Sequence, residues 1–452
     1  MTSAGGATLT ALSIDPGGRL TRLGEPAPAG PEVRGVVLTP DGGFAYAAGF
    51  QDGTIIPYRV APSGEPVRLG DPLPAGGNPA GMAMTPGGRV LYATDPPHDQ
   101  VLAFAIGADG TLTPLGAVPS GGTTPTGLAV APDGRHVYVN NGTRDAQIEN
   151  TLVVFRVQQD GTLAPTGTSI GLGKGAFASL IAITPDGRFL YTATRIGSEV
   201  WGFRVGADGD LSPVPGERFP APPMPEGVAM SPDGRNLYTA SVNRSEQNPD
   251  GANAIGAFRV RDDGGLDQVQ PPVRDGTSPA AAAISPDGRH LFVANAQSSD
   301  ISSFTITGPD GRLSTVPGSP FQAGLDFPAF QSVAVAPNQG PLARLSATPH
   351  PDHGGAIMFD ARASTDPDGQ VARYDWDFGD GTVRRDGGPT PTHHYPRPGT
   401  FTVRLVVTDN ENCADRLVFT GMSPLCNGTA AARRQLAVDI EPGRATSRPA
   451  GR

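Results

Sequence analysis

The chain has 452 residues, of which 37% are hydrophobic and 6% aromatic, and a formal net charge of -10. The acidic balance and the lack of a basic stripe argue against nucleic acid as a partner. No apolar run approaches the length of a bilayer span, so we expect no membrane insertion. The 62 glycines and 48 prolines supply the turns that many short strands need, which predicts an all-β protein with almost no helix.

A short motif returns along the first three quarters of the chain. It reads TPDGGFAY, TPGGRVLY, APDGRHVY, TPDGRFLY, SPDGRNLY and SPDGRHLF, followed by a degenerate APNQGP. The prolines of these motifs are Pro40, Pro86, Pro132, Pro185, Pro232, Pro286 and Pro337, so the unit recurs every 46 to 54 residues. A period of this length is typical of stacked supersecondary units.

Each unit predicts one four-stranded blade. A stretch of small residues precedes the Pro-Asp-Gly turn, a strand ending in Tyr or Phe follows it, and two more strands pair across an Asp-Gly turn. The opening TLTALSIDPGGRLTRLG matches only the second half of a unit, whereas QSVAVAPNQ matches only its first strand. We therefore expect the N- and C-terminal strands to complete one blade and to close seven blades without exposed edges.

The repeated pattern F-x-V-x-x-D-G-x-L-x-P followed by PDGR-x-L-Y resembles the seven-bladed YVTN and lactonase-type propellers, the group that includes 6-phosphogluconolactonases. The resemblance implies a propeller over residues 1–338, with a site of His, Arg and Glu in the active members. We located the matching places in this chain by counting from the repeat prolines. They hold other residues: Phe177, Ser179, Pro225, Glu226, Gly227, Val242 and Ala296. Phe, Val and Ala cannot relay a proton, so we expect no catalytic residue there. A lactonase-type hydrolase with a relocated site is the alternative.

Two connections between blade strands are longer than the others, NNGTRDAQIENT at 140–151 and SVNRSEQNPDGANA at 241–254. Loops on a rigid scaffold commonly carry recognition, so we predict a polar binding crescent on the face opposite the Pro-Asp-Gly turns. Its candidate residues are Arg144, Asp145, Lys174, Arg195, Arg244, Glu246 and, on a separate loop, His98. Loops without a ligand are the alternative. The sequence shows no evident aromatic platform on which a sugar could stack.

Two histidines follow the Pro-Asp-Gly-Arg turns. We expect His136 and His290 to lie on a strand surface and not in a site.

The repeated motif ends before Pro341, and a different pattern follows it. The segments YDWDFGDG and PGTFTVRLVVTDN closely resemble a polycystic-kidney-disease (PKD) domain, a small immunoglobulin-like β-sandwich, which we place at 341–440. Trp376 and Phe378 are expected in its core. Residues 441–452 have no apolar pattern and are expected to form a disordered tail.

Two further features lie in this C-terminal part. Asp366, Asp368 and Asp409 would supply hard oxygen ligands for calcium, although DPDG is equally good turn chemistry; no other cofactor is expected. Cys413 and Cys426 have hairpin-compatible spacing, which predicts a disulfide, with two free buried thiols as the alternative. A disulfide persists only in an oxidising compartment.

Together these features predict a secreted or cell-surface recognition protein. Its propeller loops would bind a glycan or a protein, and the PKD domain would act as a spacer or second contact. A lactone hydrolase and a structural assembly subunit are the alternatives. The start MTSAGGATLT lacks the regions of a signal peptide, so a cytoplasmic location is the alternative to an upstream start. The sequence implies no particular oligomeric state.

Overall fold

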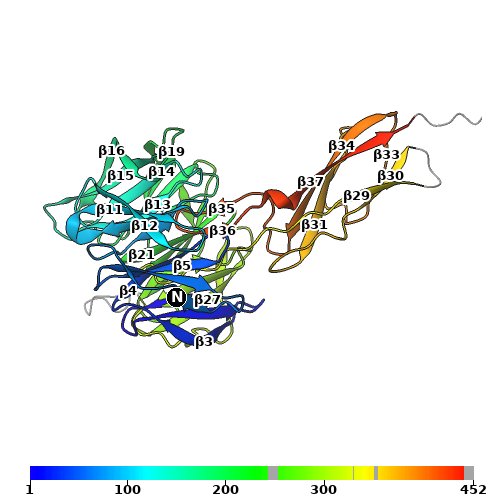
Figure 1. Cartoon of the computed structure of the whole chain (residues 1–452). Coiled ribbons are helices and arrows are strands. Elements are labelled where there is room, and N and C mark those ends of the chain that lie inside the picture. The colour runs from blue at the N-terminus through cyan, green and yellow to red at the C-terminus, as the bar shows by residue number, and fades with distance from the viewer. Residues whose placement is uncertain (243–252, 329, 351–354, 442–452) are drawn as a thin grey trace, which may run out of the picture. The chain divides into compact units, whose positions relative to one another are not determined.

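The computed structural model describes residues 1–242, 253–328, 330–350 and 355–441, which fall into two compact units (Figure 1). The propeller unit comprises Met1–Pro337 together with Val418–Leu425, and the sandwich unit comprises Asn338–Leu417 and the chain from Cys426 onward. This division differs from the predicted boundaries, 1–338 and 341–440, in two places: the sandwich unit begins at Asn338, and one later segment does not belong to it. Residues 418–425 lie with the propeller, although the chain on both sides of them belongs to the sandwich unit.

Six antiparallel sheets follow the repeat along the chain, and we number them as blades. Blade 1 holds β4 (Val33–Leu38), β5 (Phe44–Gly49), β6 (Thr54–Val60), β7 (Pro66–Arg68) and β8 (Leu73–Pro74). Blade 2 holds β9 (Met82–Met84), β10 (Val90–Asp95), β11 (Gln100–Ile106) and β12 (Leu112–Pro119), with the short 3-10 helix η1 (Pro96–His98). Blade 3 holds β13 (Pro125–Val130), β14 (His136–Asn141), β15 (Glu149–Val157) and β16 (Leu163–Lys174).

The next three blades repeat this order. Blade 4 holds β17 (Ala178–Ile183), β18 (Phe189–Thr194), β19 (Glu199–Val205) and β20 (Leu211–Pro220). Blade 5 holds β21 (Pro225–Met230), β22 (Asn236–Ser241), β23 (Ala254–Val260) and β24 (Leu266–Gln268). Blade 6 holds β25 (Pro279–Ile284), β26 (His290–Asn295), β27 (Asp300–Thr307) and β28 (Arg312–Thr315). The first strand of each blade is the small-residue stretch before the Pro-Asp-Gly turn.

Blade 7 joins the two ends of the propeller. It consists of β1 (Thr2–Ser3), β2 (Thr8–Ile14) and β3 (Leu20–Pro28), and the Thr2 amide donates to the carbonyl of Ser332 at 2.9 Å. The residues around Ser332 lie at the inner position of this blade but form no regular strand. The predicted fold class is confirmed, a seven-bladed propeller followed by a β-sandwich, with an irregular segment in place of the last predicted strand.

The tyrosine at the end of each motif links neighbouring blades. The hydroxyls of Tyr46, Tyr92, Tyr138, Tyr191 and Tyr238 each donate to a glycine carbonyl in the Asp-Gly turn of the next blade, at 2.7 to 3.3 Å. In blade 6 Phe292 has no hydroxyl, and Ser303 Oγ donates instead to the carbonyl of Gly18 at 2.7 Å. Burial raises the pKa of these tyrosines. The repeat therefore encodes the contact between blades.

The position after Pro-Asp-Gly-Arg in the motif is buried in the two blades where it holds a histidine. The side chains of His136 and His290 are each only 5% exposed, which corrects the expectation of a strand surface. Each ring lies against a glycine of the next blade, Gly209 and Gly18, where an added Cβ would lie 2.5 and 2.3 Å from the ring. Burial lowers the pKa of both imidazoles. These histidines are packing residues.

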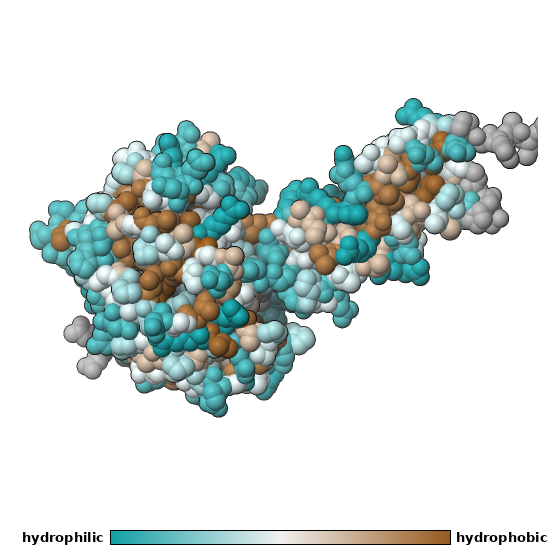
Figure 2. Space-filling model, viewed as in Figure 1, coloured by the Kyte–Doolittle hydropathy of each residue, from teal (hydrophilic) through white to brown (hydrophobic). Residues whose placement is uncertain are grey.

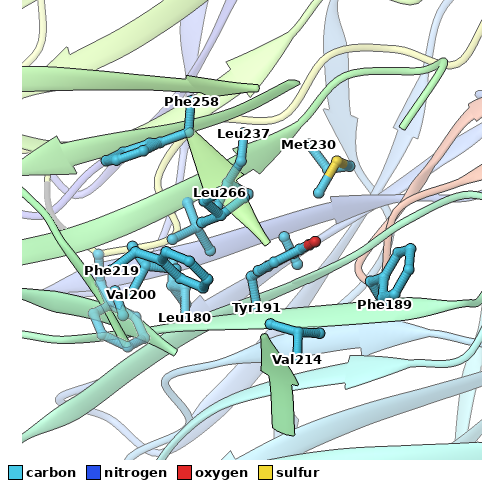
Figure 3. Packing of buried hydrophobic residues seen from close by; sticks show 14 of the residues in the cluster. Leu180, Phe189, Tyr191, Val200, Val214, Phe219, Met230, Leu237, Phe258 and Leu266 are labelled. Atoms are coloured by element: carbon cyan, nitrogen blue, oxygen red, sulfur yellow. The ribbon is translucent and has the colours of Figure 1, made fainter. Parts of the chain in front are cut away.

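Apolar side chains fill the space between blades. One cluster joins blades 4 and 5 and includes Tyr191, Val214, Leu237, Phe258 and Leu266, drawn close together in Figure 3. On the face drawn in Figure 2, hydrophilic residues cover much of the outer surface of the propeller unit, and hydrophobic residues appear in recesses. Burial of these apolar surfaces stabilises the fold by roughly 25 cal/mol per Å².

The sandwich unit has two main sheets. One contains β29 (Ser346–Pro349), β30 (Ala356–Asp360) and β33 (Thr392–His394), and the other contains β32 (Val383–Arg384), β31 (Val371–Asp377), β34 (Gly399–Asp409) and β37 (Arg433–Ile440), which follows the 3-10 helix η2 (Ala430–Ala432). Trp376 and Phe378 are buried between them at 1% and 0% exposure, as predicted. The indole Nε1 donates to the carbonyl of Gly388 at 3.0 Å.

Candidate functional site

One end of the propeller channel is built from recurring backbone bonds. In five blades the residue just before the first strand takes a positive φ; these residues are Glu32, Thr124, Phe177, Met224 and Ser278. Each lies eight positions before its repeat proline, and its carbonyl accepts a hydrogen bond from the amide ten positions after that proline. The donors are Phe50, Gly142, Arg195, Val242 and Ala296. These bonds bring two separate columns of the repeat together at the channel.

A cavity of about 480 Å³ lies among these positions. Its wall uses the two columns just described, a third column six positions before the repeat proline, and connecting segments. In that order the lining residues are Glu32, Thr124 and Phe177; Phe50, Pro96 and Arg195; Arg34, Ala80, Thr126 and Glu226; and Ala4, Arg144, Phe327 and Phe330. Because most blades contribute a residue, the cavity is a property of the closed ring.

A buried ion pair forms part of the cavity wall. Arg195 directly follows β18 and Glu226 is the second residue of β21, so the pair joins blades 4 and 5. The Arg195 Nη1 atom lies 2.9 Å from Glu226 Oε2, and the two side chains are 3% and 1% exposed. Desolvating two charges is costly, so such a pair needs a rigid environment. The ring of blades provides it and presents a fixed guanidinium in the wall.

Two guanidinium groups face the ring of Phe177. The Cζ atoms of Arg195 and Arg144 lie 4.7 and 5.1 Å from the ring centroid, within the range of cation–π attraction. Phe177 itself has φ 54°, which is unusual for a bulky side chain and costs on the order of 1–3 kcal/mol. The Arg195 amide, which donates to the Phe177 carbonyl at 3.1 Å, helps to hold that conformation.

A second guanidinium–phenyl contact lies in blade 1. The Arg34 Cζ atom is 3.4 Å from the ring centroid of Phe50, and its Nη2 is 3.8 Å from Glu32 Oε2. Phe327 and Phe330 add two more rings to the wall. The cavity therefore has an aromatic lining that composition did not reveal. Its three arginines and two glutamates leave one excess positive charge in an acidic chain.

Only some of the predicted ligand-binding residues line the cavity. Arg144 and Arg195 line the cavity. Asp145 is exposed, and its carboxylate accepts a hydrogen bond from the amide of Gln147 at 2.9 Å. Lys174 is exposed at the end of β16. Neither residue is among the described residues that line the cavity.

The other three predicted residues are His98, Arg244 and Glu246. His98 is on η1, with its side chain 55% exposed and Nδ1 2.8 Å from Oδ2 of the buried Asp95, which also accepts from Gln100 Nε2 at 2.8 Å. Arg244 and Glu246 lie outside the described residues. The binding crescent predicted from the long loops therefore stays a prediction as a whole.

Sequence reasoning missed Glu32, Arg34 and Phe50 as site residues. The signal that could have found them is the alignment of the repeats in columns, because residues at the same offset from the repeat proline return to the same end of the channel. The counted positions Phe177 and Glu226 lie in the cavity wall. Val242 and Ala296 instead pack together in a small buried apolar cluster.

The three carboxylates proposed to bind calcium lie in the sandwich unit. Burial, and after it the charges of Asp409 and Asp368, raise the pKa of Asp366 to about 6. Burial also raises the pKa of Asp368 and of Asp409, whose Oδ1 accepts from the amides of Glu411 and Cys413. Within the described ranges, no three His, Cys, Asp or Glu residues are arranged to hold a metal ion. Calcium binding stays a prediction.

The predicted disulfide is present. Cys413 and Cys426 are bonded, with their Cα atoms 5.5 Å apart. A disulfide is typical of oxidising compartments, which favours an extracellular setting. In the part of the chain that the structure describes, no helix has the length and apolar character that a membrane crossing requires.

Two family models match the chain. The model described as lactonase, 7-bladed beta-propeller, matches residues 69–177 and 214–324, and the PKD domain model matches residues 338–420. Both matches agree with the two folds described above.

Solved structures show the same propeller fold. A proposed 6-phosphogluconolactonase from Bacteroides uniformis is 21% identical, covers 69% of this chain and 90% of its own, and has a TM-score of 0.59. A periplasmic gluconolactonase from Pseudomonas aeruginosa is 18% identical, covers 71% and 97%, and has a TM-score of 0.56. Hydrazine synthase from Kuenenia stuttgartiensis is 17% identical, covers 67% and 93%, and has a TM-score of 0.52. At these identities the likeness shows the fold alone.

Curated relatives match over short stretches. A microbial collagenase from Vibrio alginolyticus is 37% identical over 86 residues, which is 19% of this chain and 10% of that protein. A collagenase from Clostridium perfringens is 44% identical over 54 residues, or 12% and 5%. The chain thus spans a tenth or less of these relatives' length. Its own two folds identify it: the chain combines a seven-bladed propeller of the lactonase type with a PKD domain.

Proposed function

We propose that the propeller is a non-catalytic recognition module that binds an acidic saccharide, a sugar ring bearing a carboxylate or a phosphate. The observation that carries this proposal is the cavity in which Arg144 and Arg195 both contact the ring of Phe177, with Arg34 over Phe50 in the same wall. Guanidinium groups match carboxylate and phosphate oxygens in a planar fork. Phenyl rings supply flat apolar surface for the body of a ligand.

The size and charge of the cavity agree with a ligand of this class. A volume of about 480 Å³ lies within the roughly 300–1,000 Å³ of small-molecule sites. The local excess of positive charge stands against a chain charge of -10, so the cavity attracts an anion that the rest of the surface would repel. The acidic sugar would be a residue of a glycan.

The disulfide and the PKD domain favour an extracellular or cell-surface protein. In that setting the propeller would hold the glycan, and the PKD domain would act as a spacer or as a contact to a protein. The large exposed hydrophobic residues described in the propeller unit are Ile14, Val67, Ile196 and Phe327, which come from separate blades and connections. They give little support to an assembly subunit, which needs a contiguous apolar patch.

Lactone hydrolysis is the alternative function. It needs a group that accepts a proton from water, and among the described residues no histidine lines the cavity. The Glu226 carboxylate is the buried candidate, but Arg195 holds it in an ion pair 2.9 Å away. The cavity therefore supports binding better than turnover.

The test is calorimetric titration of the full chain with glucuronate and glucose 6-phosphate, with glucose as the neutral match. We expect the two acidic sugars to bind and glucose to bind at least tenfold more weakly. Arg144→Gln should weaken acidic-sugar binding about tenfold, or about 1.4 kcal/mol. Arg89→Gln changes an exposed arginine beside a repeat turn and should have no effect. Equal binding of glucose, or no binding of either acid, contradicts the proposal.

A parallel assay with gluconolactone separates binding from catalysis. Turnover that is lost in Glu226→Gln would establish the hydrolase instead. Binding of the acidic sugars without turnover agrees with the recognition module.

We also propose, separately, that the carboxylates Asp366, Asp368 and Asp409 bind calcium. Supporting it is the grouping of three carboxylates, in which burial and, after it, the charges of Asp409 and Asp368 raise the pKa of Asp366 to about 6. Calcium at millimolar concentration should raise the melting temperature of the sandwich unit relative to a chelator. Asp366→Asn should abolish that difference, whereas Asp386→Asn, an exposed aspartate of the same unit, should preserve it.

A further inference from the structure

The segment between the two cysteines lies with the propeller although it follows the strands of the sandwich in sequence. β35 (Val418–Phe419) and β36 (Pro424–Cys426) pair as a short hairpin, and residues 418–425 belong to the propeller unit. Figure 1 labels both strands among those of the blades. The Cys413–Cys426 bond closes the loop at its base.

Successive residues at the tip of this hairpin each accept a hydrogen bond from a different blade. The amide of Ile183 in blade 4 donates to the Thr420 carbonyl at 3.0 Å, and that of Val130 in blade 3 donates to Gly421 at 2.8 Å. Continuing in the same direction, Met84 in blade 2 donates to the Met422 carbonyl at 3.1 Å, and Leu38 in blade 1 donates to Ser423 Oγ at 3.2 Å. Four consecutive residues thus accept hydrogen bonds from the amides of four consecutive blades.

The four amides are equivalent in the repeat. Each lies two positions before its repeat proline, at the end of the first strand of its blade. The first strand is the inner edge of a blade sheet, and its outward amides have no partner within the blade. Because these amide donors recur once per blade, they suit a bound chain in which each successive residue offers one hydrogen-bond acceptor.

The fit at Gly421 is tight. Its φ is +117°, and an added Cβ would lie 2.9 Å from the Cβ of Ala129, a residue of the blade 3 inner strand. Met422 adds a contact to blade 7, because Gln331 Nε2 donates to its sulfur at 3.0 Å. The equivalent ends of blades 5 and 6, Met230 and Ile284, instead line a small void of about 60 Å³ beside this segment.

We propose that this end of the channel is a binding site for an extended peptide backbone, and that the chain fills it with its own residues 420–423. We call this segment the plug. Its ligand chemistry is a run of consecutive acceptors, three backbone carbonyls followed by a hydroxyl, with a glycine at the second place. The disulfide restricts the free loop, which lowers the entropy lost when the plug is seated. The proposal is independent of any ligand at the other end of the channel.

Hydrogen exchange of the full chain tests the plug. In the wild type the amides of Leu38, Met84, Val130 and Ile183 should exchange slowly. Gly421→Val should accelerate all four at least tenfold and leave amides inside the β5–β6 ladder unchanged. The matched control is Gly116→Val, because Gly116 has φ +123° and nothing within 4 Å of its added Cβ.

A peptide in trans then tests recognition. The disulfide-closed peptide of residues 413–426, added to the Gly421→Val chain, should restore slow exchange at the four amides and should not bind the wild type. Four amides that stay slow in the folded variant, or a peptide that restores none of them, would overturn the proposal. If Gly421→Val does not fold, the same two measurements on Cys413→Ser/Cys426→Ser decide it.

Discussion

The two ends of the propeller channel are built from the same repeat but differ in what they expose. At the end with the cavity, equivalent positions carry different side chains, Glu32, Thr124 and Phe177 in one column and Arg34, Thr126 and Glu226 in another. At the plugged end, equivalent positions in blades 1 to 4 each donate a backbone amide, a group that does not vary with the side chain. A repeat fold can therefore offer side-chain diversity at one end and backbone uniformity at the other.

This difference has a chemical consequence. Diverse side chains can recognise a compact ligand of low symmetry, such as an acidic sugar, whereas a uniform ring of amides suits a chain with a regular spacing of acceptors. The contrast can be tested by perturbing each end and then the contacts that both ends share.

The largest effect is expected at the cavity end. Arg195→Ala leaves the carboxylate of Glu226 buried without its cation and should lower the free energy of unfolding of the propeller by about 3–5 kcal/mol. The matched control is Arg195→Met with Glu226→Leu, which removes both charges and should recover most of the loss. Urea unfolding of the three proteins measures it. A loss under about 1 kcal/mol for the single variant would contradict a buried pair.

The plugged end should respond to its disulfide. Cys413→Ser with Cys426→Ser opens a loop with a sequence separation of 13 and should cost about 3 kcal/mol in the chain-entropy model. Thermal unfolding measures the change. Reduction of the wild type should give the same shift, because the chain has two cysteines. Acidic-sugar affinity should stay the same in both cases; an equal loss of affinity would show that the two ends are coupled.

The contact between blades should give a smaller effect, common to both ends. Tyr191→Phe removes the hydroxyl that donates to the Gly264 carbonyl at 2.7 Å and should cost about 1 kcal/mol. The reverse change, Phe292→Tyr in blade 6, should add no stability, since Ser303 already donates to the corresponding Gly18 carbonyl. Urea unfolding compares the two variants with the wild type. A gain in stability from Phe292→Tyr would show that Ser303 does not satisfy the Gly18 carbonyl.

The smallest effect is expected from pH. Burial lowers the pKa of His136 and His290, so the folded propeller binds fewer protons than the unfolded chain. Their contribution to stability is complete above the ordinary histidine pKa of about 6.5 and is lost as the pH falls below it. Phe44 and Phe189 occupy the same slot in other blades.

His136→Phe with His290→Phe should therefore flatten the decline in melting temperature between pH 6.5 and 5. The single surface change Arg89→Gln serves as the control. An identical decline in the wild type and the double variant would assign the pH dependence to other groups.

Much of the fold could be predicted from the sequence, and little of the site. The motif predicted the blades because Pro-Asp-Gly turns and the following tyrosine act within one unit or between neighbours. Arg144 was selected from a long polar loop and Arg195 from the blade between the two long loops, and both line the cavity. Asp145 and Lys174 were selected on the same two grounds and are not among its lining residues. Loop polarity does not report which side of a loop faces the channel.

The sequence by itself determined the repeat, the half-blades at its two ends, the PKD-like sandwich and the cysteine pair, because these depend on local turn chemistry and on alternation along single strands. Tertiary structure alone decided which side chains meet at the cavity and where residues 420–423 lie. Arg195 meets Glu226, and Thr420 meets Ile183, only after blades from distant parts of the chain have closed around one axis. Closure is a property of the whole ring, so no single segment of the sequence encodes those contacts.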